Sequence, residues 1–210
     1  MRNVSLLRRG MMSREVEFIH TDGRQMFLTD WIPGLKPRIE LDFRRENVRE
    51  KAGLKNSLFI QPGVYSYPDN IVFGINNGSN YAQGNSFFFW NDKAYGFGGI
   101  PYWEDIRIFN NHRNKMAMDW NYAAWTDNGK WKEMRLELRQ GKCSYPIYLF
   151  GKEGNPYDRS DLYIYGVKCW NDGVLERDFR PAKIGGRYGL LDVVNGKFWT
   201  SDTGVDFLGE

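Results

Sequence analysis

Two carboxylates on one predicted strand are the first residues in this sequence whose types and spacing suggest catalysis. Glu40 and Asp42 alternate with apolar residues, and Glu46 follows. Retaining glycosidases need an acid and a nucleophile about 5–5.5 Å apart, whereas same-face neighbours on a strand are roughly 6.6–6.8 Å apart. A Glu-x-Asp-x-(x)-Glu motif that starts at Glu40 would have its third acid at position 45 at the latest, so Glu46 comes one residue too late. Arg44 occupies the next position on the same face as Glu40 and Asp42. Because flanking arginines keep carboxylates ionised, we predict that this segment is not catalytic.

Other catalytic and cofactor motifs are weak. The two histidines, His20 and His112, have no nucleophile-elbow motif to accompany them. The segment 96–99 (Gly-Phe-Gly-Gly) predicts a turn, because no helix follows to direct backbone amides at a phosphate. Cys143 and Cys169 lack metal-ligand spacing and are expected to be reduced and packed. No acidic loop has the spacing of a calcium site. We therefore expect no enzyme activity, no metal and no cofactor.

The middle of the chain is the best candidate for ligand binding, because it combines tryptophans with amides and carboxylates. Sugar rings lie flat on indole rings, while amides and carboxylates bind hydroxyl groups. The alternative is that these aromatic residues pack in the core. The predicted ligand-binding residues are Trp90, Trp103, Asp105, Asn110, Trp120, Trp125 and Asp127.

The elements that must position these residues are strands. In 38–44, Ile39, Leu41 and Phe43 share one face and charged residues share the other, which indicates a half-buried antiparallel strand. The segment 132–139 repeats this pattern with Met134, Leu136 and Leu138 inward. Further strands are expected at 71–73, 87–90, 106–109 and 145–150, the last covered on both sides, whereas 47–54 could form a short helix or a charged loop.

Turn residues predict consecutive antiparallel strands in the last third of the chain. Asn171-Asp172-Gly173 separates two β-rich runs, and Asn195-Gly196 is a second turn signal of the same kind. Glycine accepts the positive φ that tight hairpins require. Strands recur about every ten residues without a convincing helical period, as expected for a sandwich or barrel.

The first 14 residues form a short basic, methionine-rich arm, and residues 15–210 are expected to form one domain. Termini are poorly ordered unless something holds them, so we expect the arm to dock either on its own domain or on a neighbouring subunit. The predicted docking residues are Arg2, Leu6, Leu7, Arg8, Arg9, Met11 and Met12.

Composition excludes several classes of partner. The net charge is +3, which is too small to predict nucleic-acid binding, and no recognition module is evident. No run of 18 apolar residues predicts a membrane span. No cleavage site follows the first basic residues, so we expect no signal peptide and production in a cytoplasm.

Several segments of the sequence resemble segments of a known protein family. These are 5–12 (Ser-Leu-Leu-Arg-Arg-Gly-Met-Met), 17–26, 38–43, 145–150, 162–170, 177–181 and 188–199. They are similar to segments of concanavalin A-like (laminin-G-like) jelly rolls found in Bacteroidales bacteria and their phages. In that family the segment 17–26 corresponds to an opening hairpin, with His20 and Asp22 replacing small hydroxyl residues. The stretch 44–130 matches loosely.

The resemblance implies an all-β, two-sheet antiparallel jelly-roll sandwich with a short N-terminal arm. It implies a non-enzymatic structural or adhesion protein of a phage virion, such as a tail or head fibre, assembled in the host cytoplasm. Its partners would be other virion proteins, through the arm, and host surface glycans, in a homo-oligomer or larger assembly. The alternatives are a secreted or surface glycan hydrolase of this fold, a bacterial carbohydrate-binding protein, and a purely structural subunit.

Overall fold

The computed structural model describes residues 13–44, 112–119, 122–127, 129–135, 146–151 and 161–210. It also places the backbones of four strands within 56–99. All regular structure in these ranges is β-strand. Every strand pair is antiparallel. The predicted all-β class is therefore confirmed for the described residues.

Within the described part of the chain the larger sheet has 11 strands, eight of which follow one another in a continuous order. These are β11 (Lys130–Arg135), β10 (Tyr122–Asp127), β9 (Arg113–Asp119), β4 (Pro37–Arg44), β13 (Asp161–Asn171), β14 (Val174–Ile184), β15 (Arg187–Asp192) and β16 (Lys197–Trp199). Three short strands attach beside this path: β1 (Ser13–Glu15) on β14, β2 (Ile19–Asp22) on β13, and β17 (Leu208–Gly209) on β2.

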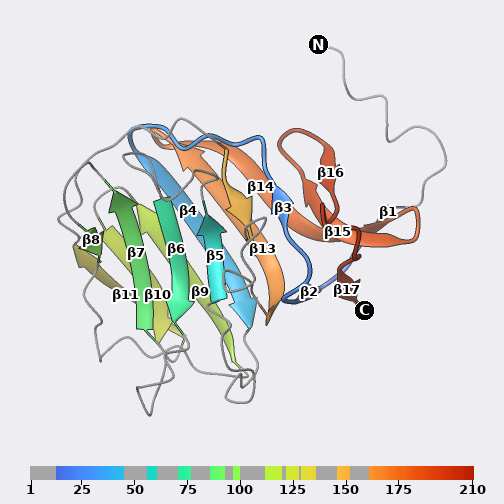
Figure 1. The fold of residues 1–210 in the computed structure, drawn as a ribbon, viewed down its shortest axis with the longest axis horizontal. Coiled ribbons are helices and arrows are strands. Elements are labelled where there is room, and N and C mark those ends of the chain that lie inside the picture. The colour runs from blue at the N-terminus through green and yellow to red at the C-terminus, as the bar shows by residue number, and fades with distance from the viewer. Residues whose placement is uncertain are drawn as a thin grey trace.

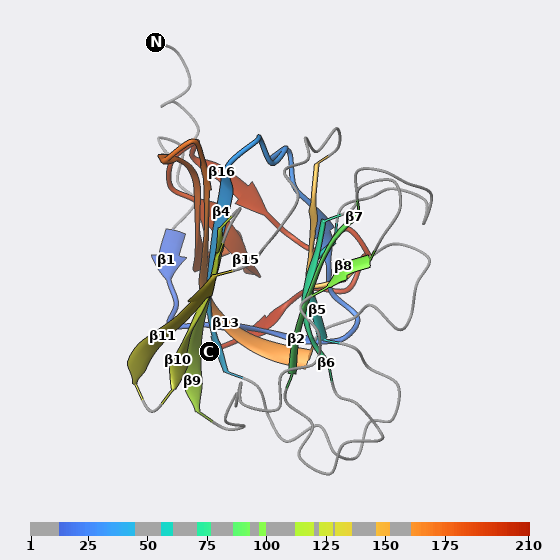
Figure 2. The ribbon, with the colours of Figure 1, turned by 90° about the vertical axis from the view of Figure 1, so that its left-hand side faces the viewer.

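The smaller sheet has six strands. In order they are β3 (Phe27–Leu28), β12 (Tyr148–Leu149), β5 (Asn56–Ile60), β6 (Ile71–Asn76), β7 (Ser86–Asp92) and β8 (Phe97–Gly99). Figure 1 shows this sheet in front of the larger one, and Figure 2 shows the two sheets edge-on as separate layers. The molecule is thus a two-layered β-sandwich.

Alternation along β4 determines which residues enter the core. Ile39, Leu41 and Phe43 are buried, whereas the charged residues between them are only partly buried, as predicted from the period of two. The core continues between the layers, where the Phe27 ring of β3 lies 6.0 Å from Phe179 and 5.6 Å from Trp199. These contacts join the two sheets.

The predicted turns form as expected. Asp172 and Gly173 have φ values of 48° and 81° between β13 and β14, and Gly196 has a φ of 70° before β16. Both central residues of the first turn have positive φ, as a tight hairpin requires, so the turn predicted from Asn-Asp-Gly is confirmed. β13 to β16 then pair consecutively.

The segment 17–26, which the family resemblance describes as a hairpin, does not form one. β2 pairs with β13 and β17 in the larger sheet, whereas β3 pairs with β12 in the smaller sheet. Buried polar side chains support this crossing: Thr21 Oγ1 donates to the Gln25 carbonyl, and Gln25 Nε2 donates to the Asp206 carbonyl. The hairpin expectation is wrong because the chain passes from one layer to the other at this turn.

Other predictions are tested in part. Ser13 and Arg14, assigned to the arm, belong to β1 and pair with Ile184 and Lys183. Cys169 is a free, buried thiol whose pKa is raised well above 9.0 by burial. The strand expected at 106–109, the continuation at 136–139, residues 47–54 and Cys143 lie outside the described residues.

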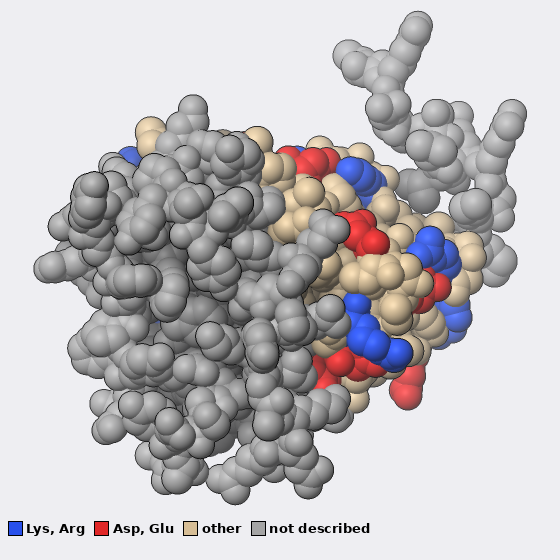
Figure 3. Space-filling view, viewed as in Figure 1, with Lys and Arg blue, Asp and Glu red and all other residues tan. Residues whose placement is uncertain are grey.

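Charge is mixed rather than segregated on the described part of the face in Figure 3. Over the C-terminal strands, basic and acidic side chains alternate with other residues. Among the ion pairs of the C-terminal strands and loops, Arg187 Nη2 lies 2.6 Å from Asp206 Oδ1.

Candidate functional site

The predicted ligand-binding residues are divided between the two sheets. Trp90 is on β7, where it pairs with Val72 and Gly99. Trp125 and Asp127 are on β10 in the other sheet. For these three residues the structure gives the backbone position. Four of the predicted ligand-binding residues lie outside the described residues, namely Trp103, Asp105, Asn110 and Trp120, as do the arm residues Arg2, Leu6, Leu7, Arg8, Arg9, Met11 and Met12.

A different tryptophan lines a hollow on the outer face of the larger sheet. Trp131 of β11 is 48% exposed, and it shares a hollow of about 270 Å³ with Arg180 of β14. Because four strands separate β11 from β14 in the sheet order, a hollow that both line shows that this face is concave. Its polar side chains are Glu40, Asp42, Lys115, Tyr165, Lys168, Asp178 and Arg180.

A second hollow adjoins the first along β4. It has a volume of about 530 Å³, and Glu40 lines both hollows. Trp170 forms part of its wall, and the guanidinium carbon of Arg38 lies 5.6 Å from the Trp170 ring centroid. The outer face therefore presents two indole rings with charged groups between them.

Most of the charged groups on this face are in ion pairs. Arg113 Nε and Nη2 donate to the two carboxylate oxygens of Asp42 at 2.7 and 2.9 Å. Arg180 Nη2 donates to Asp178 Oδ2 at 2.9 Å. The hydrogen bond to Asp42 raises the pKa of Arg113, and the hydrogen bond to Asp178 raises the pKa of Arg180. Arg38 and Glu40 form a third ion pair, in which Arg38 Nε donates to Glu40 Oε1 at 3.0 Å.

The pair considered for catalysis, Glu40 and Asp42, is thus held by cations from two strands. Arg38 neighbours Glu40 on β4, while Arg113 and Lys115 of β9 contact Asp42, with Lys115 Nζ at 3.6 Å from Asp42 Oδ2. A general acid must present a proton to the leaving group, whereas both carboxylates here are engaged in ion-pair contacts. The expectation that this segment is not catalytic stays a prediction, and these contacts support it.

Aromatic rings stack at the other end of this face. The His20 ring lies on Tyr163 with centroids 4.3 Å apart, and His20 Nε2 lies 2.9 Å from Asp161 Oδ1. The guanidinium carbon of Arg44 is 4.1 Å from the Tyr163 centroid. Because β2 and β13 are already paired at His20 and Tyr163, these contacts reinforce a strand pairing.

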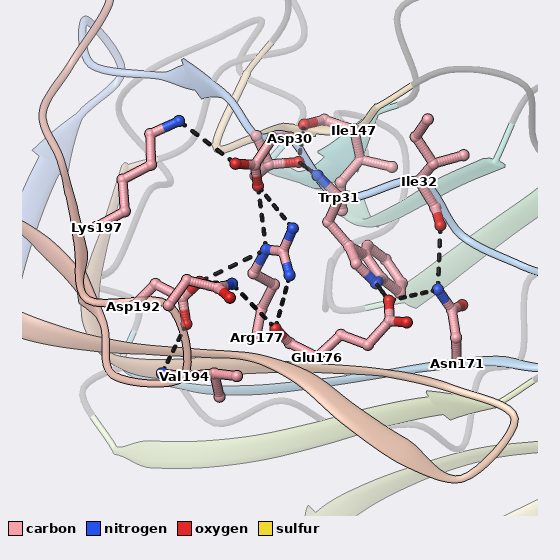
Figure 4. Close-up of polar contacts among 12 residues, drawn as sticks. Asp30, Trp31, Ile32, Ile147, Asn171, Glu176, Arg177, Asp192, Val194 and Lys197 are labelled. Carbon is pink, nitrogen blue, oxygen red and sulfur yellow. Dashed lines mark hydrogen bonds and ion pairs between the residues drawn. The ribbon is translucent and has the colours of Figure 1, made fainter. Parts of the chain in front are cut away.

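A polar network at one end of the sandwich, shown in Figure 4, connects the connector 29–36 to the β13–β14 hairpin. Trp31 Nε1 and Asn171 Nδ2 both donate to Glu176 Oε2, at 2.9 and 2.6 Å. Asn171 also donates to the Ile32 carbonyl and accepts from the Gly34 amide. One asparagine thus binds both the connector and the hairpin.

The network continues to the β15–β16 turn. Arg177 donates to Asp30 Oδ1 from Nε and Nη2, at 3.0 and 2.9 Å, and its Nε lies 3.5 Å from buried Asp192. Burial opposes ionisation of Asp30, but the hydrogen bond and charge of Arg177, together with Lys197, outweigh it and lower the pKa of Asp30 below 3.8. This end of the molecule is cross-linked by polar contacts across three loops.

Within the described ranges, no group of three or more His, Cys, Asp and Glu side chains is placed to hold a metal ion. No helix capable of crossing a membrane is found there either.

The fold and the concave face define a two-layered, antiparallel β-sandwich with an aromatic and charged outer surface. No protein-family model matches the sequence, and no curated protein matches it. Among solved structures, this chain is similar to full-length tailspike protein 2 from Escherichia coli O157:H7 bacteriophage CAB120, with a TM-score of 0.50 and 11% sequence identity. That alignment covers 78% of this chain and 24% of the tailspike chain.

A second solved structure, the enzymatically active domain of bacteriophage CBA120 tailspike protein 2, aligns with a TM-score of 0.49 and 11% identity. It covers 78% of this chain and 27% of that chain. The chain therefore spans about a quarter of the length of the tailspike structures it matches, and the first likeness shows a shared fold.

The predicted ligand-binding residues do not include Trp131, although it belongs to the same tryptophan-rich middle region, and they do not include Trp170; a signal was available for both. The predicted inward position of Met134 implies that Trp131, three residues away on the same strand, points outward. Trp170 occupies the outward position next to the turn at 171–173, in register with Arg38. Period-two alternation, applied to the tryptophans themselves, would have identified both.

Proposed function

We propose that this chain is a non-enzymatic adhesion module of a phage particle, with a concanavalin A-like jelly roll that binds glycans through the concave face of its larger sheet. The resemblance of several sequence segments to the jelly-roll family, and the fold shared with part of a phage tailspike, support this proposal. Its assembly partners would be other virion proteins. Superfolds host many functions, so the site itself has to carry the argument.

The observation that carries the proposal is the exposed indole of Trp131 in a hollow with balanced charge. Three acids face three cations there, and large apolar side chains exposed in a concavity mark binding sites. An indole provides a platform for the C–H face of a sugar, and the charged groups around it offer hydrogen bonds to hydroxyls. Balanced charge favours an uncharged glycan.

The contacts of Glu40 and Asp42 support binding without hydrolysis. Each carboxylate is engaged by at least one arginine, whereas a hydrolase on this face would need one carboxyl group to donate a proton to the leaving group. A glycan hydrolase of the same fold is the competing function.

The test is a glycan array with the full chain, followed by calorimetric titration of the strongest ligand. We expect Trp131→Ala to weaken binding at least about tenfold, as for a stacking residue at a binding centre. Trp131→Phe should retain most of the affinity because it keeps an aromatic ring. Equal affinity of wild type and Trp131→Ala would place the site elsewhere.

Hydrolysis is tested separately by measuring the release of reducing ends from the bound glycan. The proposal predicts no release above a buffer control. Release that disappears in Glu40→Gln or Asp42→Asn would replace the adhesion module with the hydrolase.

A further inference from the structure

Apolar side chains are exposed where the connector 29–36 meets the β13–β14 hairpin. Ile32 and Leu35 of the connector are 44% and 54% exposed, and Val174, which follows the hairpin turn, is 64% exposed. Asn171 pairs with Val174 and binds the main chain of Ile32, so the three side chains lie at the same end of the sandwich. We call Ile32, Leu35 and Val174 the apical patch.

The polar network beneath the apical patch fixes its position. Asn171 binds the Ile32 carbonyl and the Gly34 amide, and the Asp172 amide donates to the Lys36 carbonyl at 3.2 Å. Pro33 and Pro37 restrict the connector further, since proline fixes φ. A surface whose loops are already held loses little conformational entropy on binding. The apical patch is therefore suited to docking a partner.

The N-terminal arm has the matching chemistry. It carries apolar and basic side chains within a short stretch: Leu6, Leu7, Arg8, Arg9, Met11 and Met12. We propose that the apical patch of one copy of this chain binds the apolar residues of the N-terminal arm of a second copy.

The position of β1 favours an arm from a second copy. Ser13 pairs with Ile184, at the end of β14 opposite to Val174, as Figure 1 shows for β1 and the β13–β14 hairpin. Ten residues of strand span roughly 32–34 Å. A fully extended chain covers at most ~3.6 Å per residue, so Leu6 reaches about 25 Å from Ser13. Leu6 and the apolar residues after it are therefore too close to Ser13 to reach Val174 of their own chain.

Charge supports the same pairing. Asp172 is exposed at the hairpin turn, two residues from Val174, and Arg8 directly follows Leu7. An arm seated with Leu6 and Leu7 on the apical patch would therefore bring guanidinium groups toward this carboxylate. Exposed charge pairs of this kind contribute to orientation and association rate more than to affinity.

β1, which follows the arm in sequence, and the apical patch lie at opposite ends of β14. A contact between the arm of one copy and the patch of another joins two different surfaces and is therefore heterologous. Such head-to-tail contacts form a ring if the rotation closes and an open chain if it does not. Each copy would then use one arm and one patch, leaving the concave face with Trp131 available for ligand.

The experiment is sedimentation of the full chain across a range of concentrations. We expect association of the wild type, because an interface of micromolar affinity is largely occupied at about 100 µM. The arm variant Leu6→Asp/Leu7→Asp and the patch variant Leu35→Asp/Val174→Asp should each weaken association at least about tenfold. Both variants change residues outside the described core, and circular dichroism would confirm that they fold.

Mixing the two variants gives the decisive measurement. The arm variant keeps its patch and the patch variant keeps its arm, so a 1:1 mixture should form a dimer that stops there. Leu208→Asp, which changes an apolar residue with 47% exposure on β17, is the matched control and should associate like the wild type. A wild type that stays monomeric, or a mixture that does, would overturn the proposal.

Glycan binding separates this proposal from the adhesion function. Trp131→Ala should associate normally while losing its ligand, and the patch variant should bind ligand as a monomer. Each proposal can thus fail while the other stands.

Discussion

The polar network below the apical patch and the ion pairs on the outer face of the larger sheet are built from similar residues, but they differ in burial. Around Glu176, a buried indole and an amide converge on one carboxylate, joining residues about 140 positions apart. On the outer face, arginines pair with carboxylates while half exposed to solvent. Buried polar contacts are costly to leave unmade, whereas exposed pairs contribute little. The first region should hold the fold together, and the second can change partners without unfolding it.

Trp31→Ala should have the largest effect on stability. Trp31 is among the largest fully buried side chains described, and its removal creates a cavity and leaves Glu176 with one donor fewer. We expect a loss of about 3–5 kcal/mol, measured by urea unfolding. Trp131→Ala, on the outer face, is the control and should change stability by less than about 0.5 kcal/mol. Similar losses in both variants would contradict the distinction between the regions.

Glu176→Ala is expected to come second. It leaves the donors of Trp31 and Asn171 without their shared acceptor, which should cost about 1–3 kcal/mol. The matched control is Glu133→Ala, because Glu133 is exposed on β11 and should contribute almost nothing. If the two glutamates were equivalent in chemical denaturation, the network would not be a structural element.

Arg113→Ala should have a smaller effect, below about 1 kcal/mol, because the pair with Asp42 is half exposed. What remains should shrink further in 1 M salt, where the screening length is about 3 Å. Repeating the unfolding experiment at low and high salt measures this. A salt-independent loss would mean that Arg113 acts through packing on Tyr165, whose ring centroid lies 4.1 Å from its guanidinium carbon.

The smallest expected effect concerns pH and Asp30. Its folded pKa is lowered below 3.8, so its contribution is fully present above about pH 5 and is lost as pH falls through the folded pKa. The difference in stability between wild type and Asp30→Asn should therefore be constant near neutrality and decrease in acid. An increase on acidification would reverse the assigned sign.

Local features of the fold were predictable, because their causes are local. The burial of Ile39, Leu41 and Phe43 follows from period-two alternation, and the β13–β14 turn follows from Asn-Asp-Gly. The crossing of 23–26 between sheets was not predictable in this way. A glycine turn between two short strands is compatible with a hairpin or a layer change, and the pairing partners β12 and β13 lie at least 120 residues away.

The candidate site was less accessible to sequence reasoning than the fold. A concave face is produced by the curvature of a whole sheet, so no single segment encodes the hollow that Trp131 and Arg180 line together. Outward positions can be read strand by strand, as for Trp131 and Trp170. Which of those positions meet across the sheet depends on strand order, which the sequence patterns did not give.

The strand order also has a consequence for synthesis. β4 lies between β9 and β13, and its pairing with β13 joins Pro37 to Asn171. Until the ribosome has released the C-terminal third, β4 lacks one neighbour, and the Trp31 indole lacks its acceptor. Long-range pairing of this kind slows folding and exposes unpaired edges in the meantime. Nascent chains of this protein should therefore depend on chaperones until β13 and β14 emerge.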